Sequence, residues 1–256
     1  MVSNDKRRRQ LAREKAERQE MRREAARRKV RRRNAAIAGV IVVAMGAGAA
    51  VAAAGALGGD GGGGSDERTE PTPTPTRSEP PMAVDTKARY TMTVKTDRGD
   101  IRIAMDAAKT PRTVNSFKKL ADEGYFDRTT CHRLTTQNIH VLQCGDPQGT
   151  GMGNPGYTIP DENLGGLGKP GKDGKVTFPA GTVAMANTSR PDSGGSQFFL
   201  VYKDSRLTPT FTPFGTMDAG GLETVRKVGA AGVAGGGGDG APELPVAVEK
   251  ISVTKD

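Results

Sequence analysis

The chain has 256 residues and a net charge of +9, with 35 glycines and 16 prolines. Aromatic residues make up only 4% and tryptophan is absent, so the whole chain is not expected to form one densely packed core. Two cysteines exclude a disulfide-dense scaffold and a four-cysteine zinc site, and two histidines leave little for a His-rich metal centre. The length predicts one domain of moderate size with appendages.

The positive charge is concentrated at the N-terminus. Residues 1–33 carry 15 Lys/Arg and 5 Asp/Glu, which leaves 23 basic and 24 acidic side chains for the rest of the chain. The rest is therefore almost neutral, and binding of nucleic acid by the domain is not expected. We interpret 1–34 as a basic, partly helical cytoplasmic tail that is solvated, and adhesion to anionic lipid headgroups is the sharper hypothesis for it. Binding of RNA by this tail remains an alternative.

An uncharged run of 23 residues follows, at 35–57. As a helix it would be about 34 Å long, enough to cross a bilayer core of about 30 Å. The sequence thus predicts one transmembrane helix, with a cleaved signal peptide as the alternative. Arg31–Arg33 precede the run and acidic residues follow it, which predicts a cytoplasmic N-terminus, an extracytoplasmic domain and a cell-membrane location.

Residues 58–83 are rich in Gly, Pro and Thr and lack any apolar periodicity. Glycine runs are flexible, and Thr-Pro repeats favour extended polyproline II, so this segment is predicted to be a linker. The folded domain is predicted to occupy 84–256.

Alternation of apolar and polar residues predicts a hairpin of two strands at 90–94 and 101–105. Thr110 and Pro111 have the pattern of an N-cap and first helical residue, and Gly124 would close that helix. A second, short helix is expected at 221–228. Further strands are expected at 130–135, 139–144, 182–187, 196–202 and 246–253. This tally favours a β-barrel or sandwich with two helices over a βαβ fold.

Motifs for other chemistries are absent from the sequence. The glycine-rich segment 145–156 lacks the GxxxxGK[ST] pattern of a phosphate-binding loop. Ser196 lacks the GxSxG elbow of a serine hydrolase. His132 and His140 have no matching carboxylate or cysteine cluster. No metal and no cofactor are therefore expected.

Five short motifs follow one another along the predicted strands. They are HRL at 132–134, LQCGD at 142–146, MAN at 185–187, GSQFF at 195–199 and FG at 214–215. In this order and spacing they resemble the cyclophilin family of peptidyl-prolyl cis–trans isomerases, over roughly residues 86–254. The resemblance implies a closed eight-stranded antiparallel barrel capped by two helices, and a domain that is expected to be monomeric.

The resemblance also implies roles for individual residues. Arg133 matches the catalytic arginine, and Gln143 the second catalytic group, which hydrogen-bonds the substrate backbone. The positions matching the substrate-binding groove are His140, Val141, Ala186, Asn187, Phe199, Leu207 and Phe211. For Asn187 a purely structural role in a turn is the alternative. By strand alternation one of Phe198 and Phe199 must belong to the core, and we assign Phe199 to the proline pocket by resemblance.

Three features depart from the family pattern. His140 stands where an aromatic residue, usually Phe, is typical, and Phe211 stands where many members have His. The loop between Arg133 and Gln143 is two residues longer than in compact members. The first two changes are expected to alter the shape of the pocket and its turnover.

Cys131 and Cys144 flank a predicted hairpin centred between Gln137 and Asn138. In a hairpin they would lie nearly opposite one another, and an extracytoplasmic location favours oxidation. They are candidates for a disulfide, and two free, partly buried thiols are the alternative.

The function predicted from these features is isomerisation of Xaa-Pro bonds, which assists the folding of exported proteins. The partners would be Pro-containing polypeptides, and membrane lipid through the helix at 35–57 and the basic tail. The alternative is a membrane-tethered chaperone or scaffold that binds Pro-containing segments with little turnover.

Overall fold

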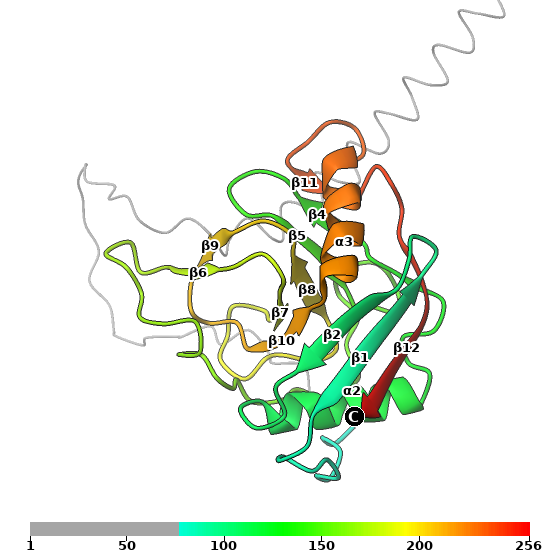
Figure 1. The fold of residues 1–256 in the computed structure, drawn as a ribbon, viewed down its shortest axis with the longest axis vertical. Helices are drawn as coiled ribbons and strands as arrows, with labels where there is room; N and C mark the ends of the chain where they lie inside the picture. Colours follow the sequence, from blue (N-terminus) through cyan, green and yellow to red (C-terminus); the bar gives the residue numbers. More distant parts are fainter. Residues whose placement is uncertain (1–76) are drawn as a thin grey trace, which may run out of the picture. The chain divides into compact units, whose positions relative to one another are not determined.

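The structure, a computed structural model, describes residues 77–256 (Figure 1). The predicted tail at 1–34, the predicted span at 35–57 and most of the predicted linker lie outside the described residues. Within 77–256, no helix combines the length and the apolar character needed to cross a bilayer.

The described part of the chain consists mainly of β-strands, with two α-helices. The strands are β1 (Tyr90–Thr96), β2 (Ile101–Met105), β3 (Thr129–Thr130), β4 (Arg133–Thr135), β5 (Val141–Cys144), β6 (Val176–Phe178), β7 (Thr182–Met185), β8 (Phe198–Val201), β9 (Ser205–Leu207), β10 (Pro213–Met217), β11 (Asp239–Gly240) and β12 (Ala247–Lys255). The helices are α2 (Pro111–Asp122) and α3 (Ala219–Ala231).

Ten of these strands form one curled antiparallel sheet, in the order β11-β4-β5-β8-β7-β10-β2-β1-β12-β3. Strands β6 and β9 pair separately as a two-stranded ribbon. The expectation of a mainly β fold with two helices is confirmed, but a ten-stranded half-barrel replaces the closed eight-stranded barrel. Two of the extra strands, β3 and β11, are only two residues long, which is too short for alternation to reveal them.

Every segment predicted as a strand coincides with a strand of the structure, but the sequence analysis missed β6, β9, β10 and β11. Pro213 and Gly215 in β10 are residues that usually mark the end of a strand. Here Gly215 is needed, because a Cβ atom at this position would lie 2.6 Å from the side chain of Ile103 on the paired strand β2.

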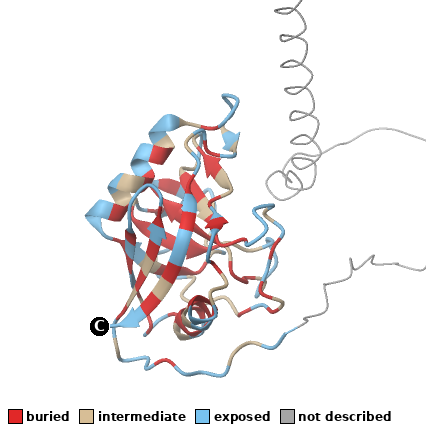
Figure 2. Ribbon diagram, turned by 90° about the vertical axis from the view of Figure 1, so that its right-hand side faces the viewer, coloured by how far each residue is buried: buried red, intermediate tan, exposed pale blue. Residues whose placement is uncertain are grey.

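The main hydrophobic core lies between the concave face of the sheet and the two helices. Helix α2 packs on β12, and α3 packs on β2, β5 and β10. Phe117 of α2 is fully buried, and its ring centroid lies 4.9 Å from that of Phe214, 5.5 Å from that of Phe198 and 5.6 Å from that of Phe126. Buried residues line the sheet while the outer face of α3 stays exposed (Figure 2).

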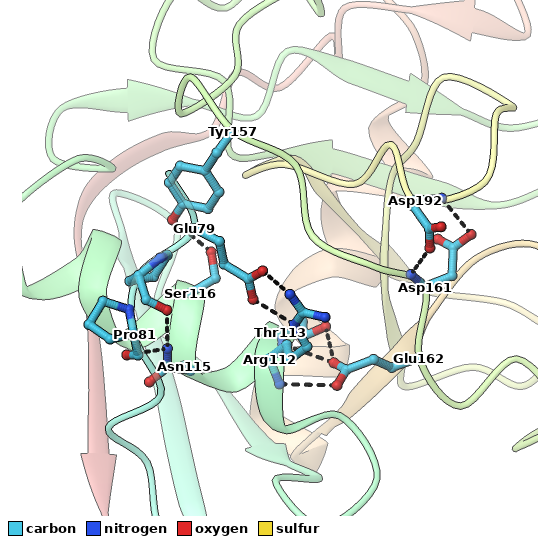
Figure 3. A network of polar contacts seen from close by, with 11 residues as sticks. Glu79, Pro81, Arg112, Thr113, Asn115, Ser116, Tyr157, Asp161, Glu162 and Asp192 are labelled. Atoms are coloured by element: carbon cyan, nitrogen blue, oxygen red, sulfur yellow. Dashed lines mark hydrogen bonds and ion pairs between the residues drawn. The ribbon is translucent and has the colours of Figure 1, made fainter. Parts of the chain in front are cut away.

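Helix α2 is capped by a residue distant in sequence. Pro111 begins the helix as predicted, but the Thr110 side chain does not cap it and donates instead to the Asp106 carbonyl. The backbone N–H groups of Arg112 and Thr113 donate to the Glu162 carboxylate, at 3.0 and 2.9 Å (Figure 3). This carboxylate satisfies two of the unpaired N–H groups that every helix leaves at its start.

Residues 77–83, the end of the predicted linker, lie against α2 (Figure 3). The buried Asn115 side chain donates to the carbonyls of Pro80 and Pro81, and its Oδ1 atom accepts from the backbone N–H of Ala83. Two ion pairs also hold this segment in place. Glu79 pairs with Arg112 of α2, and Arg77 pairs with Glu123, the residue after the helix. The folded unit thus includes residues ahead of position 84.

We expect Asn115→Ala to lower the free energy of unfolding by about 1–3 kcal/mol, because it leaves three backbone groups without their partner. Thermal melting of residues 77–256 should show the loss as a lower Tm. Lys118→Ala, at a partly exposed position on the same helix, is the control and should change stability by no more than about 0.5 kcal/mol. Equal melting of Asn115→Ala and wild type would show that residues 77–83 do not stabilise the domain.

Candidate active site

Three of the predicted site residues lie side by side across the sheet. Arg133 on β4 is paired with Gln143 on β5, which is paired with Phe199 on β8. Neighbouring strands lie about 5 Å apart, so these side chains form a continuous row on one face of the sheet. The row combines a cation, an amide and an aromatic ring.

Alternation along β5 and β8 sorts their side chains between two faces. Leu142 and Phe198 point into the main core and are fully buried. Val141 and Phe199 point to the opposite face. Gln143, two residues after Val141 on β5, points to the same face. The assignment of Phe199 rather than Phe198 to the site face agrees with this arrangement.

A second apolar cluster, here called the outer cluster, covers this opposite face. Its buried members are Val141, Val176, Phe178, Ala184, Phe199, Val201 and Leu207, and the half-buried residues packed against it are Ile139, Leu167, Ala186 and Phe211. The Phe199 and Phe211 rings meet edge to face with centroids 5.4 Å apart. Five predicted substrate-binding positions are therefore brought together, at Val141, Ala186, Phe199, Leu207 and Phe211.

The Arg133 guanidinium is held on two sides. Its Nε and Nη2 atoms donate to the two carboxylate oxygens of Asp239, at 2.8 and 2.7 Å. Its Nη1 atom donates to Oε1 of Gln143 at 3.2 Å. A guanidinium has five N–H groups, so two remain for another acceptor. The Arg133 side chain is only 21% exposed, so these groups lie at a partly sheltered position.

Gln143 is oriented by a second glutamine that the sequence analysis missed. Nε2 of Gln143 donates to Oε1 of Gln197 at 2.8 Å. Nε2 of Gln197 in turn donates to the carbonyls of Gly151 and Gly153, at 3.0 and 2.9 Å. Gln197 stands within the GSQFF motif, one residue before β8, so the motif contains the only signal for it.

The glycine-rich loop that holds Gln197 is built around a buried carboxylate. Asp146 accepts backbone N–H groups of Gln148, Thr150 and Gly151. Burial of Asp146 raises its pKa, but these bonds and one from Gly153 outweigh that effect and lower the pKa overall. The loop thus has a structural role, in agreement with the absence of a phosphate-binding motif in its sequence.

The ring of His140, a predicted groove position, lies beside Tyr202 rather than on Phe199 and Phe211. Its ring packs edge to face on Tyr202, with centroids 5.7 Å apart, beside Lys203 and Arg226. Burial and Lys203 lower the pKa of His140. Ile139 contacts the outer cluster instead. Strand alternation explains the difference, because His140 lies on the same side of β5 as Leu142.

Asn187 lies beside the outer cluster, but its side chain is engaged within the protein. Oδ1 accepts from the N–H of Ser189 at 3.1 Å, and Nδ2 donates to the carbonyl of Thr210 at 2.7 Å. These bonds agree with the alternative that the Asn187 side chain has a structural role in a turn. Any contact with substrate would therefore involve the backbone of Asn187 or a rearranged side chain.

His132 neighbours Arg133 but points away from the row. Its two ring nitrogens are buried without a hydrogen-bond partner, and burial lowers its pKa below the ordinary 6.5. Among residues 77–256, no group of three or more His, Cys, Asp or Glu side chains is arranged to hold a metal ion.

Cys131 and Cys144, the predicted pair, form a disulfide with their Cα atoms 4.0 Å apart. Cys131 lies two residues before Arg133, and Cys144 directly follows Gln143. The disulfide therefore links the end of β5 to the segment just before β4, beside the polar part of the row. Both cysteines are buried in the main core.

The comparisons with known proteins identify the family. Residues 91–253 match the family model described as cyclophilin type peptidyl-prolyl cis-trans isomerase/CLD. The chain therefore belongs to the cyclophilin family. It is 45% identical over 168 residues to the probable peptidyl-prolyl cis-trans isomerase B of Mycobacterium tuberculosis (strain H37Rv), a match that covers 64% of this chain and 54% of the relative.

Other relatives cover different shares of the chain. The peptidyl-prolyl cis-trans isomerase B of Bacillus subtilis (strain 168) is 38% identical over 125 residues, which is 48% of this chain and 80% of the relative. A cyclophilin-type isomerase of Cryptosporidium parvum, crystallised in the presence of the dipeptide Ala-Pro, has the same fold, with a TM-score of 0.52 and 23% identity over 65% of this chain and 99% of that one. The chain spans about half the length of the mycobacterial relatives, 54% to 57%.

Reduction of the Cys131–Cys144 disulfide should lower the free energy of unfolding by about 3 kcal/mol, as expected for a closed loop of about 15 residues. The sequence separation here is 13. Thermal melting with and without reductant would measure the loss. The double variant Cys131→Ala/Cys144→Ala is the control, and its Tm should not respond to reductant. Two free thiols in the native, air-exposed protein would contradict the disulfide.

Proposed function

We propose that this protein accelerates cis–trans rotation about Xaa-Pro peptide bonds. The observation that carries the proposal is the row of Arg133, Gln143 and Phe199 over the outer cluster, within a chain of the cyclophilin family. Relatives at 45% and 38% identity bear the name peptidyl-prolyl cis-trans isomerase, which supports the same activity here.

The chemistry required is electrostatic rather than covalent. The barrier to rotation, about 18–20 kcal/mol, arises from amide resonance, and no bond is broken in crossing it. In the twisted state the prolyl nitrogen becomes pyramidal and gains a lone pair. A guanidinium donor aimed at this nitrogen or at the prolyl carbonyl stabilises that state and keeps its charge at any physiological pH. The two remaining N–H groups of Arg133 are suited to this role.

The outer cluster would supply the other half of the site. Phe199, Phe211 and Leu207 offer apolar surface on which a proline ring would lose contact with water. Gln143 retains one N–H of its amide group beyond the bond to Gln197, and this N–H is available to the substrate backbone. A 10⁵-fold acceleration would need only about 7 kcal/mol of preferential binding of the twisted state.

Arg133→Ala should lower kcat/KM by about 10²–10³, the usual loss on removal of a preorganised donor. The fold should persist, because the Arg133–Asp239 pair is partly exposed and such pairs contribute about 0–1 kcal/mol. Turnover of an Xaa-Pro peptide by residues 77–256 should be measured beside thermal melting. Gln143→Ala is the comparison and should lose less, since its main role is to orient the arginine and the peptide.

Several outcomes would contradict this assignment. If Arg133→Ala kept more than about a third of the activity, the guanidinium would not be the main electrostatic group. A large drop in its Tm would make Arg133 a structural residue. Binding of Xaa-Pro peptide by the wild type without any acceleration would favour the alternative, a domain that holds Pro-containing segments.

We also propose that the isomerase domain is tethered to the outer face of the cell membrane and assists the folding of exported proteins. The support comes from the sequence: an uncharged run at 35–57, Arg31–Arg33 before it, and acidic residues after it. The disulfide between Cys131 and Cys144 is compatible with an oxidising compartment.

Protease added to intact spheroplasts should digest the isomerase domain and spare the tail at 1–34, because positive residues remain on the cytoplasmic side. Antibodies against the tail and the domain would follow the two parts separately, and lysed spheroplasts would show that the tail itself can be cut. A domain that is protected until lysis would contradict the proposed topology.

A further inference from the structure

Asp239 occupies a position from which it can set the direction of the Arg133 guanidinium. Its two carboxylate oxygens accept the Nε–H and one Nη2–H of Arg133, at 2.8 and 2.7 Å. Bonding at two points fixes both the position and the plane of a guanidinium, which a single bond does not. The third bond, from Nη1 to Gln143, leaves one free N–H on Nη1 and one on Nη2, both in the plane of the guanidinium.

Asp239 is itself held by a short β-structure rather than by a mobile loop. It lies on β11, where Asp239 pairs with Thr135 and Gly240 with Leu134 of β4. The preceding residue, Gly238, accepts the backbone N–H of Thr136 at 2.9 Å. The backbone of Asp239 is thus paired with the strand that carries Arg133, although the two residues are 106 positions apart in the sequence.

From this geometry we propose that Asp239 is the positioning residue of the isomerase site, which holds the Arg133 guanidinium aimed across the outer cluster at the prolyl nitrogen or carbonyl. The inference rests on the proposed function. The carboxylate also offsets part of the positive charge that the reaction uses, so its removal has two opposing effects. Water screens the gain in positive charge, because the Asp239 side chain is 53% exposed. The lost orientation of the guanidinium is therefore the larger effect, and the rate should fall.

Asp239→Asn should therefore lower kcat by about tenfold with little change in KM, because an acceptor that faces the guanidinium is replaced by an N–H donor. Asp239→Glu, which keeps the carboxylate, should recover part of the loss. Glu243→Gln is the matched control, since it removes one exposed negative charge on the same segment and should leave kcat unchanged. In an Arg133→Ala background, Asp239→Asn should have no further effect.

A second measurement tests the positioning without relying on turnover. In the wild type the Arg133 Nε–H should exchange slowly with water and give a sharp ¹⁵N-correlated NMR signal, assigned by its absence in Arg133→Lys. The signal should broaden or disappear in Asp239→Asn and persist in Glu243→Gln.

The two measurements separate the two claims. An inactive wild type with a protected Nε–H that needs Asp239 would overturn the proposed function while leaving the positioning of Arg133 intact. Equal protection of the Nε–H in wild type and Asp239→Asn would overturn the inference, as would an unchanged or raised kcat in an active Asp239→Asn enzyme.

Discussion

The site depends on one constraint, the alternation of side chains along β5 and β8. With a period of two, every second residue enters the main core and the others face the outer cluster. Leu142 and Phe198 anchor the strands from inside, so Gln143 and Phe199 have no freedom to leave the opposite face. A shift of β5 or β8 by one residue would turn that strand's member of the row, Gln143 or Phe199, toward the core.

Residues from distant parts of the chain hold the polar side chains of the row in place through hydrogen bonds. The loop around Asp146 presents two carbonyls to Gln197, which in turn orients Gln143. Gln143 and Asp239 both accept hydrogen bonds from the Arg133 guanidinium. Each side chain in this series makes at least one hydrogen bond to another, which offsets part of the cost of a half-buried polar row. The arrangement is suited to a reaction that needs a preorganised donor and no covalent chemistry.

The same principle of distant partners applies to helix α2. Glu162 caps its N-terminus, and Asn115 fastens the segment 77–83 along its side. A chain that enters the domain through this segment is therefore attached to α2 before the first strand begins.

The sequence by itself determined the strands with clear alternation, both helices, the family and most of the apolar positions of the site, because these follow from local periodicity and from short motifs. Only the tertiary structure decided that the His140 ring packs on Tyr202 and that Glu162 rather than Thr110 caps α2. It also decided that Asp239 holds Arg133 and that Gln197 holds Gln143. These contacts join residues whose spacing in the chain carries no periodic signal, since pairing of distant strands brings them together.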